Sequence, residues 1–203
     1  MSTVVAGAAI SAFASEASLT GREVHPRERF PLKLHINSFG DAPLDRGVGR
    51  AVEDWNSLAL EVLGVRVFER VERVEDAQVV VAAEPAAAAA SRGNLMGWAE
   101  VKAEANGTIV LPVRVKVAEP RARGKVSRET VLYQVLAHEL GHALGLAHVS
   151  DPKSIMCCVT GSVDFGDPVV AEAYVQARRH PDVRSVRVQL GEQYATVGKQ
   201  EGK

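Results

Sequence analysis

The run from His138 to His148 contains three histidines and constrains the fold more than any other part of the sequence. His138 and His142 are four residues apart, so on a helix their imidazoles project from one face and can reach the same metal ion. His148 lies six residues after His142, which is too far along a continuous helix to share that site. Gly145 can adopt a positive φ, so we expect the helix to end there and the chain to turn back.

Three imidazoles that meet in this way leave one coordination position open, which is typical of a catalytic zinc rather than a closed structural one. Glu139 follows the first histidine, so its carboxylate can hold a water at that position and take its proton. The alternative is a coincidental histidine-rich helix end. Five specified residues at these spacings are expected by chance in such a chain only about once in 10⁵. We therefore predict that His138, His142 and His148 bind one zinc ion.

A methionine follows the histidine run at a defined distance. Met156 lies eight residues after His148 and ends the stretch HVSDPKSIM. Together with the run, it resembles the metzincin zinc endopeptidases, whose HExxHxxGxxH motif is followed by a methionine turn. The stretch is most similar to the matrixin branch of that family. The resemblance implies His138, His142 and His148 as zinc ligands, Glu139 as the general base, and Met156 as the apolar floor beneath the metal.

The pattern of predicted elements extends this resemblance to the N-terminal half. We expect strands over residues 31–36, 65–71 and 78–83, and between the first two a helix that is capped by Asp45 and ends at Gly64. This strand–helix–strand–strand order resembles the first half of a matrixin. The resemblance implies an α+β, zincin-like metzincin catalytic domain. Its sheet would be twisted, five-stranded and mostly parallel, with an antiparallel edge strand and three helices.

The remaining elements are predicted from turn and cap residues. Residues 84–94 favour a loop or a short turn. Ser127 is expected to cap the helix that carries the zinc motif, and Asp167-Pro168 to begin a helix that runs to about residue 180. A short hairpin is expected over residues 186–190. We expect a leader or flexible segment over residues 1–30, the catalytic domain over 31–180, and a C-terminal tail over 181–203.

A hairpin before the zinc helix is expected to border the substrate cleft. Its two strand-like runs, residues 95–102 and 108–117, flank the turn signal Asn106-Gly107. In the resembled fold the first run is the edge strand at the cleft, and an extended substrate would pair with its backbone around Gly97, Trp98 and Ala99. The alternative is an ordinary edge hairpin with no role in ligand binding, and an aromatic such as Trp98 more often belongs to a core.

Side-chain selectivity is expected to come from the segment after Met156. Residues 159–165 replace the proline and tyrosine that the family usually has there, and Val159 is expected to contact the substrate. This departure leaves the preferred substrate open.

The two cysteines, Cys157 and Cys158, are adjacent, so they provide no disulfide framework. In related metzincins the position of Cys158 holds a tyrosine that can reach the zinc. One interpretation is therefore that Cys158 approaches the metal, or pairs with Cys157, and makes activity sensitive to redox state. The alternative is that both are small buried apolar residues. No cysteine precedes the motif to serve as the family's latency device, and no histidine-rich stretch is present for a second zinc.

Composition narrows the class of protein. A hydrophobic content of 46% is sufficient for a core, and a net charge of −1 without a basic stripe argues against nucleic-acid binding. No apolar stretch is long enough for a membrane span. Residues 1–21 carry one charge, at Glu16, and read either as an atypical export leader or as a flexible N-terminus. The resemblance favours export, so we expect a secreted or periplasmic protein, and a monomer.

These observations favour a zinc-dependent endopeptidase that acts on peptide or protein substrates. The alternative is a zinc-bearing peptide- or protein-binding module that is catalytically silent or narrowly specific. Loss of the glutamate would favour the silent module, but Glu139 is present. A thiol protease that uses Cys157 or Cys158 is disfavoured, because the nearby imidazoles are committed to the metal.

Overall fold

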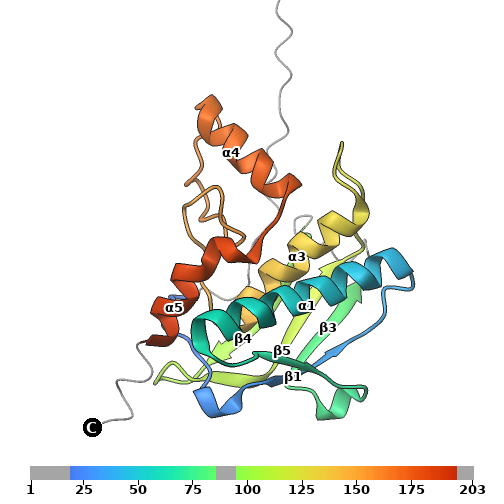
Figure 1. Cartoon of the computed structure of the whole chain (residues 1–203), viewed down its shortest axis with the longest axis vertical. Coiled ribbons are helices and arrows are strands. Elements are labelled where there is room, and N and C mark those ends of the chain that lie inside the picture. Colours follow the sequence, from blue (N-terminus) through green and yellow to red (C-terminus); the bar gives the residue numbers. More distant parts are fainter. Residues whose placement is uncertain (1–18, 86–94, 196–203) are drawn as a thin grey trace, which may run out of the picture.

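The computed structural model describes residues 19–85 and 95–195, and its centre is a five-stranded mixed sheet (Figure 1). The strands lie in the order β2-β1-β3-β5-β4. Their bounds are β1 Leu32–Ile36, β2 Phe68–Arg70, β3 Val79–Glu84, β4 Gly97–Ala103 and β5 Ile109–Ala118. β1, β2, β3 and β5 run parallel, and β4 pairs antiparallel with β5 at the end of the sheet. The predicted α+β metzincin architecture is confirmed, but the described residues form four α-helices where three were predicted.

Two long helices, α1 (Ala42–Leu63) and α3 (Arg128–Ala143), lie side by side on one face of this sheet (Figure 1). Their apolar faces and the sheet form the core, and Trp55 of α1 is fully buried within it. The Trp55 indole donates a 2.9 Å hydrogen bond to the carbonyl of Ala137, which satisfies its polar atom inside the core. This contact fixes α1 against the middle of α3, one residue before the zinc motif.

The predicted cap of α1 is wrong by four residues. The N-cap is Asp41, and Pro43 occupies the first turn, where a missing N–H costs no hydrogen bond. Asp45 instead lies inside the helix and reaches back to the preceding loop. Its carboxylate accepts hydrogen bonds from the Ser38 hydroxyl at 2.8 Å and from the Phe39 amide at 3.0 Å. The sequence therefore predicts correctly that a helix begins in this region, but it places the N-cap four residues too late.

Other predicted caps and turns are confirmed. The Ser127 hydroxyl accepts from the Thr130 amide at 3.1 Å at the start of α3. Asp167 caps α4 (Pro168–Arg179) by accepting from the Val169 amide at 2.8 Å. Gly107 adopts a φ of +86° in the turn between β4 and β5. Of the loop predicted over residues 84–94, residues 86–94 lie outside the described part of the chain.

The hairpin predicted over residues 186–190 is wrong, because this segment is helical. A 3-10 turn, Val183–Val186, leads into α5, Arg187–Ala195, which packs beside the end of α1 (Figure 1). Val186 and Leu190 fit both an alternating and a helical pattern. Val188 between them is 69% exposed, whereas a two-residue alternation would have placed it on the buried face.

Described residues on both sides of the predicted range 31–180 pack against the rest of the structure. Val183, Val186, Leu190 and Tyr194 are all buried in the core. Before residue 31, Val24 forms a parallel bridge with Thr108. We therefore infer that the domain includes the described segments on both sides of 31–180. Within the ranges that the structure describes, no helix is long and apolar enough to cross a membrane.

His25 joins the N-terminal segment to the end of α3. It is fully buried, and its Nε2 lies 2.8 Å from the carbonyl oxygen of Ala143, to which it donates. Burial is the largest cause that lowers the pKa of His25, to about 4. The folded protein therefore keeps this imidazole neutral at pH values where the unfolded chain already binds a proton.

We predict that His25 makes the fold sensitive to acid. Its folded pKa lies below its unfolded value, so its contribution to stability is present above about pH 6.5 and is lost as the pH falls toward about 4. The loss amounts to at most roughly 3 kcal/mol. Urea unfolding of wild type and His25→Gln between pH 7 and pH 4 tests this, since glutamine keeps a donor but does not titrate. Parallel stability curves for the two proteins would refute the assignment.

Candidate metal centre and active site

Three imidazoles converge at the C-terminal end of α3. The Nε2 atoms of His138 and His142 lie 3.1 Å apart, and the Nε2 of His148 lies 3.1 Å from the first and 3.2 Å from the second. Within the described part of the chain, these three histidines are the group of side chains arranged so that they could hold a metal ion. The structure therefore brings together the three residues that the sequence predicts as ligands.

The geometry of these nitrogens fits zinc. Two nitrogens bound tetrahedrally at zinc–nitrogen distances of about 2.0–2.1 Å lie roughly 3.3–3.4 Å apart, close to the spacing observed. The Nδ1 of His138 donates to the carbonyl of Ile155 at 2.8 Å, and that of His142 donates to the carbonyl of Leu146 at 2.7 Å. These bonds fix the tautomer and leave the Nε2 lone pairs directed at the shared point.

The imidazoles are held in the neutral form that a metal requires. Burial lowers the pKa of His142 to about 3 and that of His138 well below its usual value, and the neighbouring imidazoles add to both shifts. Burial also lowers the pKa of His148. At neutral pH the ligands therefore do not need to lose a proton before a cation binds.

Gly145 allows the third ligand to reach the first two. It adopts a φ of +89°, and the amides of Gly145 and Leu146 turn back to bond the carbonyls of His142 and Gly141. A side chain at position 145 would also collide with the carbonyl oxygen of Glu23. Glycine is thus required twice, by the backbone conformation and by the approach of the N-terminal segment.

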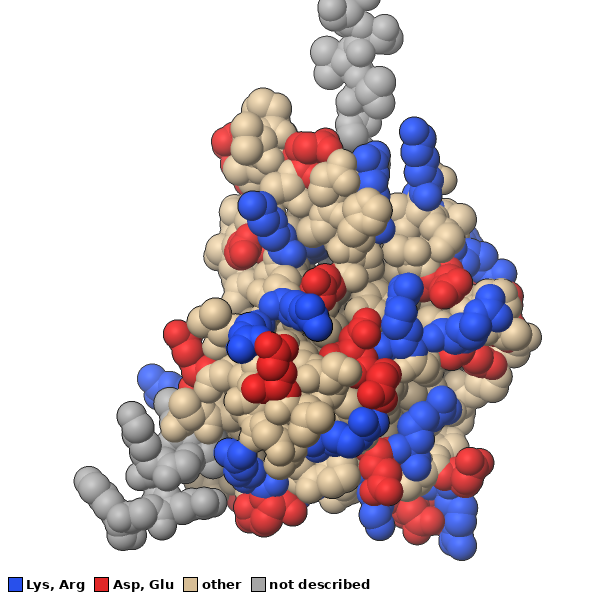
Figure 2. All heavy atoms as spheres, in the orientation of Figure 1, with Lys and Arg blue, Asp and Glu red and all other residues tan. Residues whose placement is uncertain are grey.

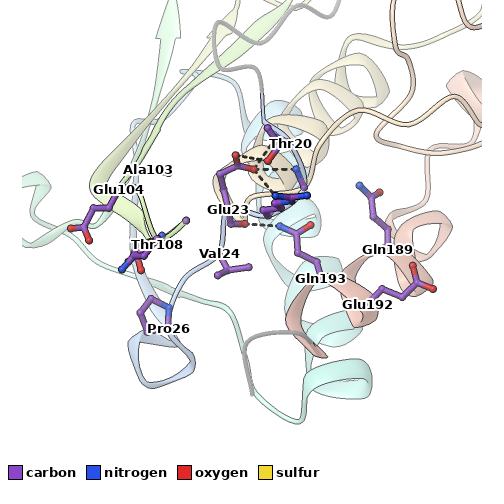
Figure 3. A pocket seen from close by; sticks show the side chains of 15 residues that line it. Thr20, Glu23, Val24, Pro26, Ala103, Glu104, Thr108, Gln189, Glu192 and Gln193 are labelled. Atoms are coloured by element: carbon purple, nitrogen blue, oxygen red, sulfur yellow. Dashed lines mark hydrogen bonds between the residues drawn. The ribbon is translucent and has the colours of Figure 1, made fainter. Parts of the chain in front are cut away.

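Side chains from both ends of the domain bond the carbonyls around this turn. Tyr194 and Gln189 of α5 donate to the carbonyls of Leu144 and Ala147, each at 2.9 Å. Gln193 donates to the Glu23 carbonyl at 2.7 Å, a bond that Figure 3 shows at the groove between α5 and the N-terminal segment. Sequence reasoning missed these residues, although their helical spacing was a usable signal. They fix the segment that leads to His148.

Met156 lies where the resemblance implies a floor. It is fully buried, and its carbonyl accepts from the Val149 amide at 3.1 Å, which ties the methionine turn to the residue after His148. A Cβ at Gly141 would collide with the Met156 sulfur. Gly141, between the two helical histidines, was not predicted as a site residue. The structure shows that its missing side chain admits the methionine beneath them.

Glu139 is buried beside the edge strand. Burial raises the pKa of its carboxyl well above the usual value, and its Oε2 makes no hydrogen bond among the residues described. A Cβ built on Gly97 would lie 3.0 Å from the Glu139 carboxylate and 2.5 Å from Val135. Gly97 therefore lets β4 lie directly against the carboxylate. A cation at the three imidazoles would favour the ionised form of Glu139.

A profile of the matrixin family, Peptidase M10, matches residues 45–166, which is more than half of the chain. The chain belongs to the matrixin family. It is also 52% identical over 41 residues to macrophage metalloelastase of Oryctolagus cuniculus. That match covers 20% of this chain and 9% of the relative, so the chain spans a small part of the relative's length. The family range contains the histidines and Met156 but ends before α4 and α5.

The predicted substrate residues of this matrixin occupy different environments. Gly97, Trp98 and Ala99 begin β4, the last strand of the sheet, but Trp98 is 2% exposed and Ala99 is fully buried. The side chains of Trp98 and Ala99 are buried on opposite faces of the strand, which leaves the backbone of β4 as the part that an extended peptide could pair with. Val159 is 45% exposed in the loop after Met156. Substrate contact by these residues stays a prediction.

The sulfur atoms of Cys157 and Cys158 lie in contact with each other. The two predicted arrangements of Cys158, at the metal or bonded to Cys157, stay predictions. Among the described residues, the group that could hold a metal consists of the three histidines, and neither cysteine sulfur belongs to it. Arg178 donates to the carbonyl of Cys157 at 3.3 Å, which places the pair against α4. An effect of this pair on activity stays a prediction.

We predict that Gly97→Ala destabilises the fold. The new methyl would lie 2.5 Å from a Val135 carbon, so β4 or α3 must shift, at a cost of about 1–3 kcal/mol. Gly49→Ala on α1 is the matched control, because a Cβ there meets nothing within 4 Å. In the control, the free energy of unfolding should rise by up to about 1 kcal/mol. Equal urea midpoints for wild type and Gly97→Ala would contradict the close approach.

Proposed function

We propose that this matrixin is a zinc-dependent endopeptidase that hydrolyses bonds within peptides or proteins. The observation that carries the proposal is the convergence of three Nε2 atoms within 3.2 Å, at the end of the helix that also carries the buried Glu139. A structural zinc site would use a fourth protein ligand, and the described residues offer three. The open position is then proposed to hold the water on which Glu139 acts.

A zinc ion at this site supplies a Lewis acid that activates water and polarises the scissile carbonyl. Glu139 is proposed to take the proton from the attacking water and return it to the leaving amine. Its environment supports this role, because Glu139 is buried and its Oε2 has no hydrogen-bond partner among the described residues, which leaves this oxygen free to accept a proton. The Nδ1 bonds of His138 and His142 hold the imidazoles in place.

The substrate is proposed to lie extended along β4. This strand is the antiparallel last strand of the sheet, and it passes the Glu139 carboxylate at Gly97. Backbone pairing there would align a peptide carbonyl with the site without reading its sequence. The presence of Glu139 favours a hydrolase over a silent zinc-bearing module. We further propose that the protein acts as a monomer in the secreted or periplasmic space, in keeping with its family.

The purified chain is predicted to bind one zinc ion, because the described residues hold one set of ligands. His148→Ala should weaken zinc binding by at least about tenfold, since the two helical histidines form only half of a tetrahedral site. Elemental analysis and competition with a zinc-binding dye measure the stoichiometry and the affinity. Two tightly bound zinc ions per chain would contradict a single set of ligands.

Glu139→Gln is predicted to keep the zinc and the fold while peptide hydrolysis falls by roughly 10²–10⁴-fold. The amide has nearly the same shape but cannot accept the proton. Hydrolysis of casein and of a quenched fluorescent peptide measures the loss, with chelator-treated enzyme as a blank. Glu69→Gln, an exposed position on β2, is the matched control and should cleave like wild type. A Glu139→Gln protein with full activity would remove Glu139 as the base.

A further inference from the structure

A cavity of about 200 Å³ lies between α3, α4 and the loop that precedes α3. Its apolar wall includes Val126, Val131 and Tyr174. Four further lining residues are cationic: Arg123, Lys125, Arg178 and Arg179. None of the lining residues is acidic. The proposed mechanism assigns this cavity no role.

The cavity shares its walls with the metal centre. Gln134 lines it one helical turn before His138, and Met96 lines it one residue before Gly97. Arg178 donates to the carbonyls of Pro152 and Cys157, at 3.2 and 3.3 Å, on either side of the methionine turn. The Nδ1 of His138 bonds Ile155 in that same turn. A group in the cavity would therefore lie beside the reacting centre.

The positive charge of this cavity lacks a counter-charge. No ion pair joins any of its four cations to a carboxylate within residues 19–85 and 95–195. Arg178 is half-buried, stacks 4.1 Å above the Tyr174 ring, and has a buried Nε without a hydrogen-bond partner. A cation removed from water in this way favours an incoming anion.

The positive charge of the cavity lining is a property of this site alone and does not reflect the charge of the whole chain. On the face shown in Figure 2, basic and acidic side chains are interspersed, and the net charge of the chain is −1. An anion is therefore drawn to this cavity by its own residues and not by the overall field of the protein.

We propose that this cavity binds the side chain of a glutamate in the substrate, next to the bond that is cut. The proposal rests on the peptidase function and names a substrate class for it. The methylene groups of the glutamate would pack on Val131 and Tyr174. Its carboxylate would accept hydrogen bonds from Lys125 and Arg179 at the rim and be attracted by Arg178, whose Nη atoms already donate to the methionine turn. Glutamine has the same shape without the charge, so it is the matched comparison.

Cleavage of a peptide library varied at each position around the scissile bond tests the selectivity. At one position we expect kcat/KM to be about 10- to 100-fold higher for glutamate than for glutamine, the usual advantage of a hydrogen bond to a charged group. The advantage should shrink as ionic strength rises, because Lys125 and Arg179 are exposed. Equal rates for glutamate and glutamine at every position would overturn the proposal.

Reversal of the rim charges locates the effect. In the double variant Lys125→Glu and Arg179→Glu we expect the preference for glutamate to disappear, while Arg121→Glu keeps it. Arg121 is an exposed arginine of the same loop that does not line the cavity. Arg178 is left unchanged, because its bonds to the methionine turn make it part of the fold. An unchanged preference in the double variant would place the selectivity elsewhere.

A binding measurement separates this proposal from the peptidase function. Fluorescence anisotropy of labelled peptides on zinc-loaded Glu139→Gln, which should not cut them, is expected to show tighter binding of the glutamate peptide by about tenfold or more. If wild type cuts no peptide but this difference is found, the cavity proposal stands and the peptidase function fails. If both peptides bind equally well, the cavity proposal fails, whether or not wild type cuts them.

Discussion

The site depends on a reversal of the chain at a single residue. Two ligands lie on one helix, and the third reaches them only because the backbone turns at Gly145 with a φ of +89°. The same Cα lies against the Glu23 carbonyl, and Gln193 approaches from α5. At Gly145, a local backbone conformation thus coincides with a contact between the two ends of the domain. The metal centre is therefore a property of the whole domain and not of its motif alone.

The parts that the sequence predicted were those governed by local rules. The spacing of the histidines, the cap at Ser127 and the turn at Gly107 each follow from a few neighbouring residues. The helix over 187–195 was missed because Val186 and Leu190 satisfy two periodicities, and only the packing of the core decides between them. Gly97 was predicted for another role, and Gly141 was not predicted. Their role is to leave space for residues distant in the sequence, such as Glu139 and Met156.

Burial gives the site its chemical character before any ion binds. Water is excluded from His138, His142 and Glu139, and the pKa shifts of all three favour their neutral forms. A dication would reverse this balance for the carboxyl while it uses the lone pairs that burial has kept free of protons. Folding and metal binding should therefore support each other in this protein, since each lowers the free energy that the other requires.

The hydrogen bonds donated by α5 also bear on the choice of borders for an expressed fragment of the protein. The range that matches the family, residues 45–166, contains every predicted ligand but neither Glu23 nor Gln189, Gln193 and Tyr194. A recombinant fragment with those borders would carry the whole motif and lose the partners of the carbonyls of Leu144 and Ala147. We therefore expect the working unit to extend beyond the matched range, because residues distant in the sequence bond the end of α3, and a sequence motif does not reveal where such bonds come from.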